Sequence, residues 1–331
     1  MKKIDEDIIY ISEEANKLGF SGKTFLISGA TGMIGRMLVN ALKKVTKEEN
    51  IYVMGLDLKE AQTVYINTQC VPTSFTYLST IKNNIDFIIH LASPTNSKFM
   101  TEKPVETISF IYESTKQILD FAISHKSKVL YISSMEAFGE VLDDKKRKEE
   151  ELGFVPLTNP RSSYPEAKRL CELLCYSYSV EYNLPVYIAR LAQTFGAGTV
   201  KTDTRIFGYL ARCAINKEDI VLGTKGESFG NYCYLGDTLA SFFYILAKGN
   251  KGETYNVVGD DTRVRIIDLA NLVKEKIAHN SINIKFDLSS GGVYPKPTLL
   301  NMSNESLKSI GWKPKFSLQE MFERMIASWQ E

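Results

Sequence analysis

Two short stretches of this sequence carry residue types that together can move protons. The first, residues 133–136, places the hydroxyl of Ser134 two positions before the carboxylate of Glu136; the second places Tyr164 four positions before Lys168. On a helix, residues four apart lie on the same side. A phenol has a pKa of about 10, so it acts as a base near neutral pH only when positive charge stabilises its phenolate. Lys168 can supply that charge while Ser134 holds the substrate oxygen, an arrangement typically worth about 10²–10⁴-fold in rate.

Upstream, the chain has the features of a dinucleotide-binding turn. An apolar run, Thr24 to Ser28, is followed by Gly-Ala-Thr-Gly-Met-Ile-Gly and then by a helical pattern. Glycines between a strand and a helix let the backbone approach a pyrophosphate, which the N–H groups at the helix start can bind. The residues that we expect to contact the cofactor are Gly29, Thr31, Gly32, Met33, Ile34 and Gly35.

A carboxylate follows the second expected strand. This strand runs from Ile51 to Leu56 and is followed directly by Asp57. A carboxylate at this place accepts hydrogen bonds from a ribose 2′-hydroxyl and repels a 2′-phosphate, which favours NAD over NADP. An ordinary turn aspartate is the alternative interpretation of Asp57, and the glycine turn ahead of it favours the ribose role.

The remaining pattern predicts an α/β fold. We expect strands at Phe75 to Leu78, Phe87 to Leu91 and Val129 to Ser133, and a helix over Val105 to Ile123. Strands that alternate with helices form a parallel sheet covered on both faces, here a Rossmann-type doubly wound sheet. Ser134 would then lie at the carboxyl end of a strand, where such sheets bind their ligands.

The helix that carries the Tyr and Lys pair has two apolar faces. Ser163 and Glu166 predict a capping box at its start. One apolar stripe suits packing on the sheet, and Leu173, Tyr176 and Val180 mark the second. A helix that is apolar on two sides is buried on both, so the second face predicts contact with a partner subunit.

Composition narrows the class of protein. The 331 residues have a formal net charge of +1, which gives no electrostatic case for binding nucleic acid or an anionic membrane surface. The N-terminus shows no signal peptide and no stretch is long enough to span a bilayer, so we expect a cytoplasmic protein. Five scattered cysteines suit reduced thiols. Cys171 and Cys175 are one turn apart, but nearby sequence supplies no further ligand, and we expect no metal.

With these motifs in place, the chain resembles the extended short-chain dehydrogenase/reductases, in the branch of NAD-dependent nucleotide-sugar epimerases, dehydratases and decarboxylases. The similarity covers nearly the whole chain, from the Gly29 turn through Ser-Ser-x-x-x-Phe-Gly at 133–139 and Tyr-x-x-x-Lys at 164–168 to Gly-Trp-Lys-Pro at 311–314. It implies that bound NAD⁺ takes a hydride from C4 of a sugar on a nucleotide diphosphate while Tyr164 removes the hydroxyl proton. It also implies a homodimer formed through the helix after Tyr164.

The resemblance leaves the product open. Glu136 stands where several sugar 4,6-dehydratases have a glutamate that removes the C5 proton, but Met135 replaces an acid that some of them use. Glu136 leads us to rank dehydration first among the alternatives, 4-epimerisation second and decarboxylation of a glucuronate third. A dinucleotide-binding regulator without catalysis is the alternative from a different class. A structural role for Glu136, bonded to a helix start or a loop, is its alternative interpretation.

The substrate side departs from the family pattern. Gln193 replaces a common asparagine, Gly230 replaces an arginine that binds phosphate, and a second family arginine has no counterpart at 297–301. Two phosphates without cationic partners are costly to bury. Arg205, Arg212 and Lys296 are the candidates to compensate. The expected substrate-binding set is Ser134, Met135, Gln193, Arg205 and Tyr232.

We expect three parts in the chain. A helical extension covers 1–20, an NAD-binding domain covers 21–194 and 232–258, and a substrate-binding lobe covers 195–231 and 259–331, with the sugar in the cleft between the last two. Leu91, Ala92 and Ser93, at the end of an NAD-domain strand, complete the expected cofactor contacts together with Tyr164 and Lys168.

Overall fold

A seven-stranded parallel sheet forms the centre of the protein in a computed structural model that describes residues 1–55, 69–71, 75–289 and 297–331. The strand order is β12-β7-β5-β4-β1-β2-β3, so the chain runs outward from β1 in both directions. The strands are β1 (Phe25–Ser28), β2 (Ile51–Met54), β3 (Gln69–Val71), β4 (Phe87–His90), β5 (Lys128–Ser134), β7 (Val186–Leu191) and β12 (Thr254–Val257). This confirms the predicted Rossmann-type α/β fold.

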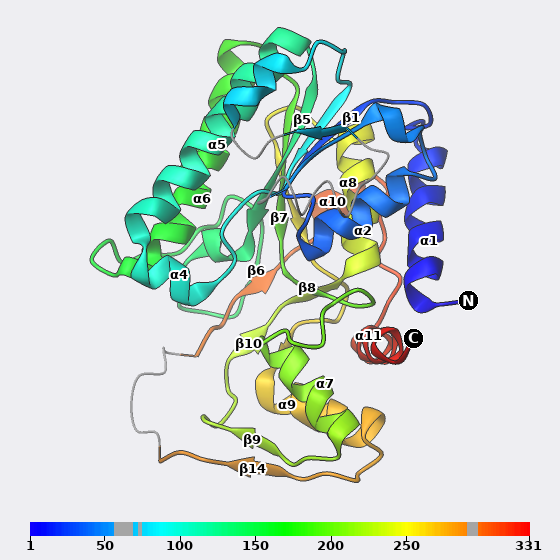
Figure 1. Cartoon of the computed structure of the whole chain (residues 1–331). Coiled ribbons are helices and arrows are strands. Elements are labelled where there is room, and N and C mark those ends of the chain that lie inside the picture. Colours follow the sequence, from blue (N-terminus) through cyan, green and yellow to red (C-terminus); the bar gives the residue numbers. More distant parts are fainter. Residues whose placement is uncertain (56–68, 72–74, 290–296) are drawn as a thin grey trace.

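Helices cover both faces of the sheet, which is why its strands are continuous apolar runs. One face carries α5 (Pro104–His125) and α6 (Ser163–Glu181), with the short α4 (Ser97–Glu102) beside them (Figure 1). The other carries α2 (Met33–Leu42), α8 (Leu235–Lys248) and α1 (Lys3–Lys17). Each set of helices shares a buried apolar core with the sheet.

A smaller unit lies beyond the carboxyl ends of the strands (Figure 1). Its own core joins α7 (Ile206–Asn216), α9 (Ile266–Leu272) with a π-helical turn over Val273–Ile277, and α11 (Leu318–Gln330). The lobe boundaries expected from the sequence, 195–231 and 259–331, stay a prediction. Leu307 and Trp312 fall within these boundaries but pack in the core that the sheet shares with α1, α2 and α8. The remaining strands and the last short helix are β6 (Lys146–Arg147), β8 (Gln193–Phe195), β9 (Ile220–Leu222), β10 (Phe229–Gly230), β11 (Tyr232–Tyr234), β13 (Val264–Arg265), β14 (Ile284–Phe286), β15 (Asn301–Met302) and α10 (Glu305–Ser309).

Two local predictions were wrong. Residues Phe75–Thr80 form a 3₁₀ helix, because Gln69–Val71 takes the place of the expected third strand beside β2. The capping box is absent, because a 3₁₀ turn over Pro160–Ser162 leads into α6 and the backbone is already helical before Ser163. The hydroxyl of Ser163 donates instead to Met100 O.

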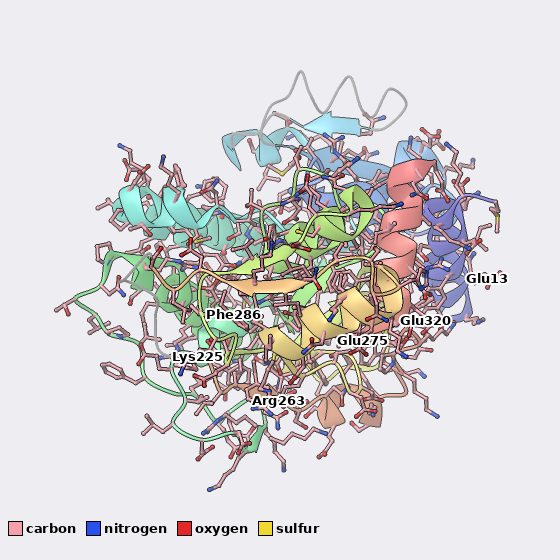
Figure 2. All side chains as sticks on the ribbon, turned by 90° about the horizontal axis from the view of Figure 1, so that it is seen from below. Glu13, Lys225, Arg263, Glu275, Phe286 and Glu320 are labelled. Carbon is pink, nitrogen blue, oxygen red and sulfur yellow. The ribbon has the colours of Figure 1, made fainter. Side chains whose placement is uncertain are left out.

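The N-terminal helix α1 is bound to the body of the protein by buried polar contacts. Asp7 accepts hydrogen bonds from the Tyr234 hydroxyl and from Arg324 Nη2, the latter at 2.6 Å. Figure 2, viewed from below, shows α11 beside α1, with Glu320 and Glu13 labelled on them. No helix in the described part of the chain combines the length and the hydropathy of a membrane span.

Candidate active site

The turn between β1 and α2 has the form that a dinucleotide phosphate requires. Gly29 has a φ of +70°, and a Cβ there would lie 2.8 Å from Ala92 N. A Cβ at Gly35 would lie 2.4 Å from Gly29 O, so neither position accepts a side chain without movement. Gly32 precedes α2 and provides no side-chain cap, so the helix start can direct N–H groups at a ligand. The turn therefore fits the cofactor predicted from the sequence.

Other predicted cofactor residues surround this turn. Thr31 lies in it, and Met33 and Ile34 begin α2. Residues 91–93 follow β4, and Ala92 N donates to Ser28 Oγ at 3.3 Å, which holds this loop against the turn. Asp57 lies outside the described residues, so its ribose role stays a prediction.

The predicted hydroxyls converge at the end of β5. Ser134 ends the strand, and its Oγ accepts a hydrogen bond from Glu136 N at 3.2 Å, which starts the 3₁₀ turn Met135–Phe138. Tyr164, in the first turn of α6, is 8% exposed. Burial, and after it the charge of Glu136, raise the pKa of Tyr164 to about 12, while the nearby hydroxyls of Ser134 and Ser93 and the charge of Arg161 lower it. The structure thus brings Ser93, Ser134 and Tyr164 together.

Lys168 lies one helical turn further along α6, also buried. Its Nζ donates to Ile132 O at 2.8 Å and lies 5.7 Å from the centroid of the Tyr164 ring and 4.9 Å from that of Tyr131. Burial lowers the pKa of Lys168 to about 8. Below that pH the ammonium is charged, and it can stabilise a phenolate at Tyr164.

Arg161 is a site residue that the sequence patterns did not reveal. Its Nη2 lies 2.7 Å from Glu136 Oε2, its Nε donates to Ser97 Oγ at 3.0 Å, and its Cζ lies 5.6 Å from the centroid of the Tyr164 ring. Its Nη1 is buried without a hydrogen-bond partner in the described part of the chain. A cation three residues before Tyr164 was the available signal, but the direction of the Arg161 side chain depends on the 3₁₀ turn that carries it.

The other residues predicted to bind the substrate lie on separate elements and do not form one cluster. Met135 packs with Phe138 and Leu300 in a small apolar cluster, and Gln193 opens β8, half-buried. Tyr232 is fully buried, with a hydroxyl that has no partner among the described residues.

The two candidate arginines in the smaller unit already have contacts. Arg205 is bound to Asp203, with Nη2 to Oδ2 at 2.6 Å, and Arg212 donates to the backbone of Lys201 and Asp203. Lys296 lies outside the described residues. The roles of Arg205 and Tyr232 toward a substrate stay predictions.

Comparison with known proteins gives a consistent family. Residues 25–258 match the model of the NAD dependent epimerase/dehydratase family. The chain is 26% identical to UDP-glucuronic acid decarboxylase 5 of Arabidopsis thaliana, covering 91% of this chain and 87% of that protein, and 24% identical to human dTDP-D-glucose 4,6-dehydratase, covering 95% and 91%. In structure it resembles the UDP-glucose 4-epimerase of Thermotoga maritima solved with UDP-glucose, with a TM-score of 0.80, 18% identity and coverage of 93% and 98%.

Proposed function

The chain belongs to the NAD-dependent epimerase/dehydratase family, and from that premise we propose that it oxidises a nucleotide-linked hexuronate at C4 and then releases C6 as carbon dioxide. The oxidation is supported by the convergence of Ser134, Tyr164 and Lys168 at the carboxyl edge of the sheet, next to the glycine turn. The second step is supported by one observation above all, the guanidinium of Arg161 beside Tyr164.

In the first step, the chain's own residues handle the C4 hydroxyl. Ser134 holds the hydroxyl oxygen, and Tyr164 as phenolate takes its proton. Lys168, buried and charged, stabilises that phenolate. The glycine turn from Gly29 to Gly35 would hold NAD⁺, which would supply the acceptor for the C4 hydride and positive charge beside the phenol. The sugar is left with a ketone at C4.

In the second step, a C6 carboxylate lies β to the C4 ketone. The C5–C6 bond breaks, carbon dioxide leaves, the electron pair passes through C5 to the C4 oxygen, and a proton then adds at C5. Arg161 Nη1 has no partner among the described residues, and a guanidinium N–H makes a charged hydrogen bond with a carboxylate. This step needs no acid to protonate a leaving hydroxyl, which suits the apolar Met135.

Dehydration is the second candidate, and Glu136 supports it. Its carboxylate is 40% exposed and lies close enough to raise the pKa of Tyr164. After C4 oxidation it could remove the C5 proton while the C6 hydroxyl leaves. The sequence alone favours this reaction, and the position of Arg161 beside Tyr164 changes the preference.

The predicted homodimer remains part of the proposal. On α6, Leu173, Tyr176 and Val180 are 61%, 54% and 66% exposed, on the helix that also carries the catalytic pair. These three apolar side chains support a second copy of the chain packed along α6.

The products of a panel of nucleotide sugars, separated by mass spectrometry, test the proposal. We expect hexuronates to lose the mass of carbon dioxide. Arg161→Ala should raise KM for the hexuronate about tenfold or more, which corresponds to one lost charged hydrogen bond. Arg265→Ala, whose exposed guanidinium binds Asp268 in the smaller unit, is the matched control. Loss of water from a neutral hexose, with hexuronates unchanged, would establish dehydration instead.

A further inference from the structure

A buried ion pair lies behind the catalytic end of β5. Arg190, on β7, places Nη2 2.6 Å from Glu172 Oε2 and Nε 3.1 Å from Glu172 Oε1. The side chains of Arg190 and Glu172 are 2% and 10% exposed. Neither residue has a part in the two reaction steps proposed above.

Each member of the pair touches a segment that carries a catalytic group. The hydroxyl of Ser133, the residue before Ser134, donates to Glu172 Oε1 at 2.5 Å. The Cζ of Arg190 lies 4.6 Å from the ring centroid of Phe138, which ends the 3₁₀ turn carrying Glu136. The pair therefore joins β5, the turn after it, α6 and β7 at one point.

Glu172 also continues the catalytic face of α6. It lies four residues after Lys168 and eight after Tyr164, so the three side chains are on one side of the helix. Lys168 Nζ bonds Ile132 O while Glu172 bonds the Ser133 hydroxyl, so two successive residues of β5 hold two successive turns of α6. This fixes the height of Tyr164 over Ser134.

Stability alone does not account for such a pair. Removing two charges from water costs several kcal/mol per ion, and an apolar pair of the same size is often equally stable. A bidentate pair does, however, define both distance and orientation between the elements that it joins. Its value to this protein is therefore geometric.

We propose that Glu172 and Arg190 are positioning residues for hydride transfer, holding Tyr164 and Lys168 in register with Ser134; this inference rests on the proposed C4 oxidation. Neither touches the substrate. Both act through the segments that they bind.

The charge of Glu172 has a second consequence at Lys168. The groups around the ammonium are Tyr164, Cys171, Glu172 and Cys175 on α6, Tyr131 on β5 and His90 on β4. Burial lowers the pKa of Lys168, and Glu172 is among the groups that raise it again. Removing this carboxylate therefore lowers that pKa further, and Lys168 loses its charge at a lower pH.

The test compares Glu172→Gln with Glu181→Gln, an exposed position at the end of the same helix. We expect Glu172→Gln to lower kcat for cofactor reduction by about 100-fold, the cost of a displacement of about 1 Å, with KM little changed. The alkaline limb of its pH profile, set by Lys168, should move to lower pH. Glu172→Asp should recover part of kcat, and Ser133→Ala, which keeps the ion pair, should lose less.

A Glu172→Gln protein with the kcat and the pH limb of the parent would overturn the proposal. If Glu172→Gln does not fold, Glu172→Asp decides, because its shorter side chain cannot span the same distance, and a kcat equal to that of the parent there would also overturn the proposal. NMR titration of ¹⁵N-labelled lysine in cofactor-free protein reads the Lys168 pKa without a substrate. If the Lys168 titration is the same in Glu172→Gln as in the parent, the result counts against the ion pair. If the parent protein reduces no cofactor with any sugar, the result counts against the proposed C4 oxidation instead.

Discussion

The segment at the end of β5 and the segment 230–237 use their polar side chains in opposite ways. At β5, Ser134 and Tyr164 face each other at the edge of the sheet, with Arg161 and Glu136 next to them. In 230–237 the polar groups point into the protein. Asp237 accepts from Tyr10 of α1 at 3.1 Å and from the backbone N–H of Lys315 at 2.9 Å.

This difference separates the residues that the proposed mechanism assigns to a ligand from residues that hold parts of the chain together. Burial raises the pKa of Asp237 to about 6, although several donors lower it, so this carboxylate has been removed from solvent to bind other parts of the chain. Tyr234 is bound to Asp7 in the same manner. The second segment thus joins the N-terminal helix and the C-terminal region to β11 and α8.

The missing arginine at position 230 has a local reason. A Cβ on Gly230 would lie 2.3 Å from the Tyr232 hydroxyl, so the position accepts no side chain while Tyr232 keeps its present orientation.

Of the changes that test this comparison, Tyr164→Phe should have the largest effect, and it should act on the rate of cofactor reduction. Losing the phenol removes the base that takes the C4 proton, so cofactor reduction should fall by at least about 10³-fold, within the range of positioned acid–base groups. Absorbance of the reduced nicotinamide in a single turnover measures it. Tyr182→Phe, an exposed tyrosine just after the same helix, is the control and should change the rate less than about twofold. A Tyr164→Phe protein that keeps the parent rate would remove the tyrosine from the mechanism.

Gly230→Ala tests the second segment and should act on stability. The added methyl group meets the Tyr232 hydroxyl, so we expect a loss of about 1–3 kcal/mol in the free energy of unfolding, measured in urea. Tyr232→Phe removes a hydroxyl without a partner in the described residues and should be nearly neutral. The Cε2 and Cζ atoms of the Tyr232 ring would also lie 2.5 Å from the added Cβ, so Gly230→Ala should cost less in a Tyr232→Leu background, which lacks the ring, than in the Tyr232→Phe background, which keeps it. Equal costs in the Tyr232→Leu and parent backgrounds would show that Tyr232 does not limit position 230.

The fold could be predicted because its signals are local and repeat along the chain. Buried parallel strands read as apolar runs, and β1, β4 and β5 lie within a residue or two of their expected ends. The third strand was misplaced, because a strand of three residues, Gln69–Val71, is too short to compete with the alternation in Phe75 to Leu78.

Arg161 could not be predicted for a different reason. Its contact with Glu136 joins residues 25 apart, and it forms because the 3₁₀ turn capped by Asn159 directs the Arg161 side chain toward the turn that follows β5. The ion pair of Glu172 and Arg190 likewise depends on the packing of α6 against β7. Sequence periodicity identifies the elements, whereas these contacts are set by how the elements meet.

The most direct test of the central claim is the fate of the C4 hydrogen in a nucleotide hexuronate that carries deuterium at C4. With the enzyme and its bound cofactor, we predict that the deuterium appears on the reduced nicotinamide in a single turnover, with a primary isotope effect on its formation, and that carbon dioxide is released. Carbon dioxide release with the deuterium still on C4 at every stage, and no reduced nicotinamide, would contradict the account.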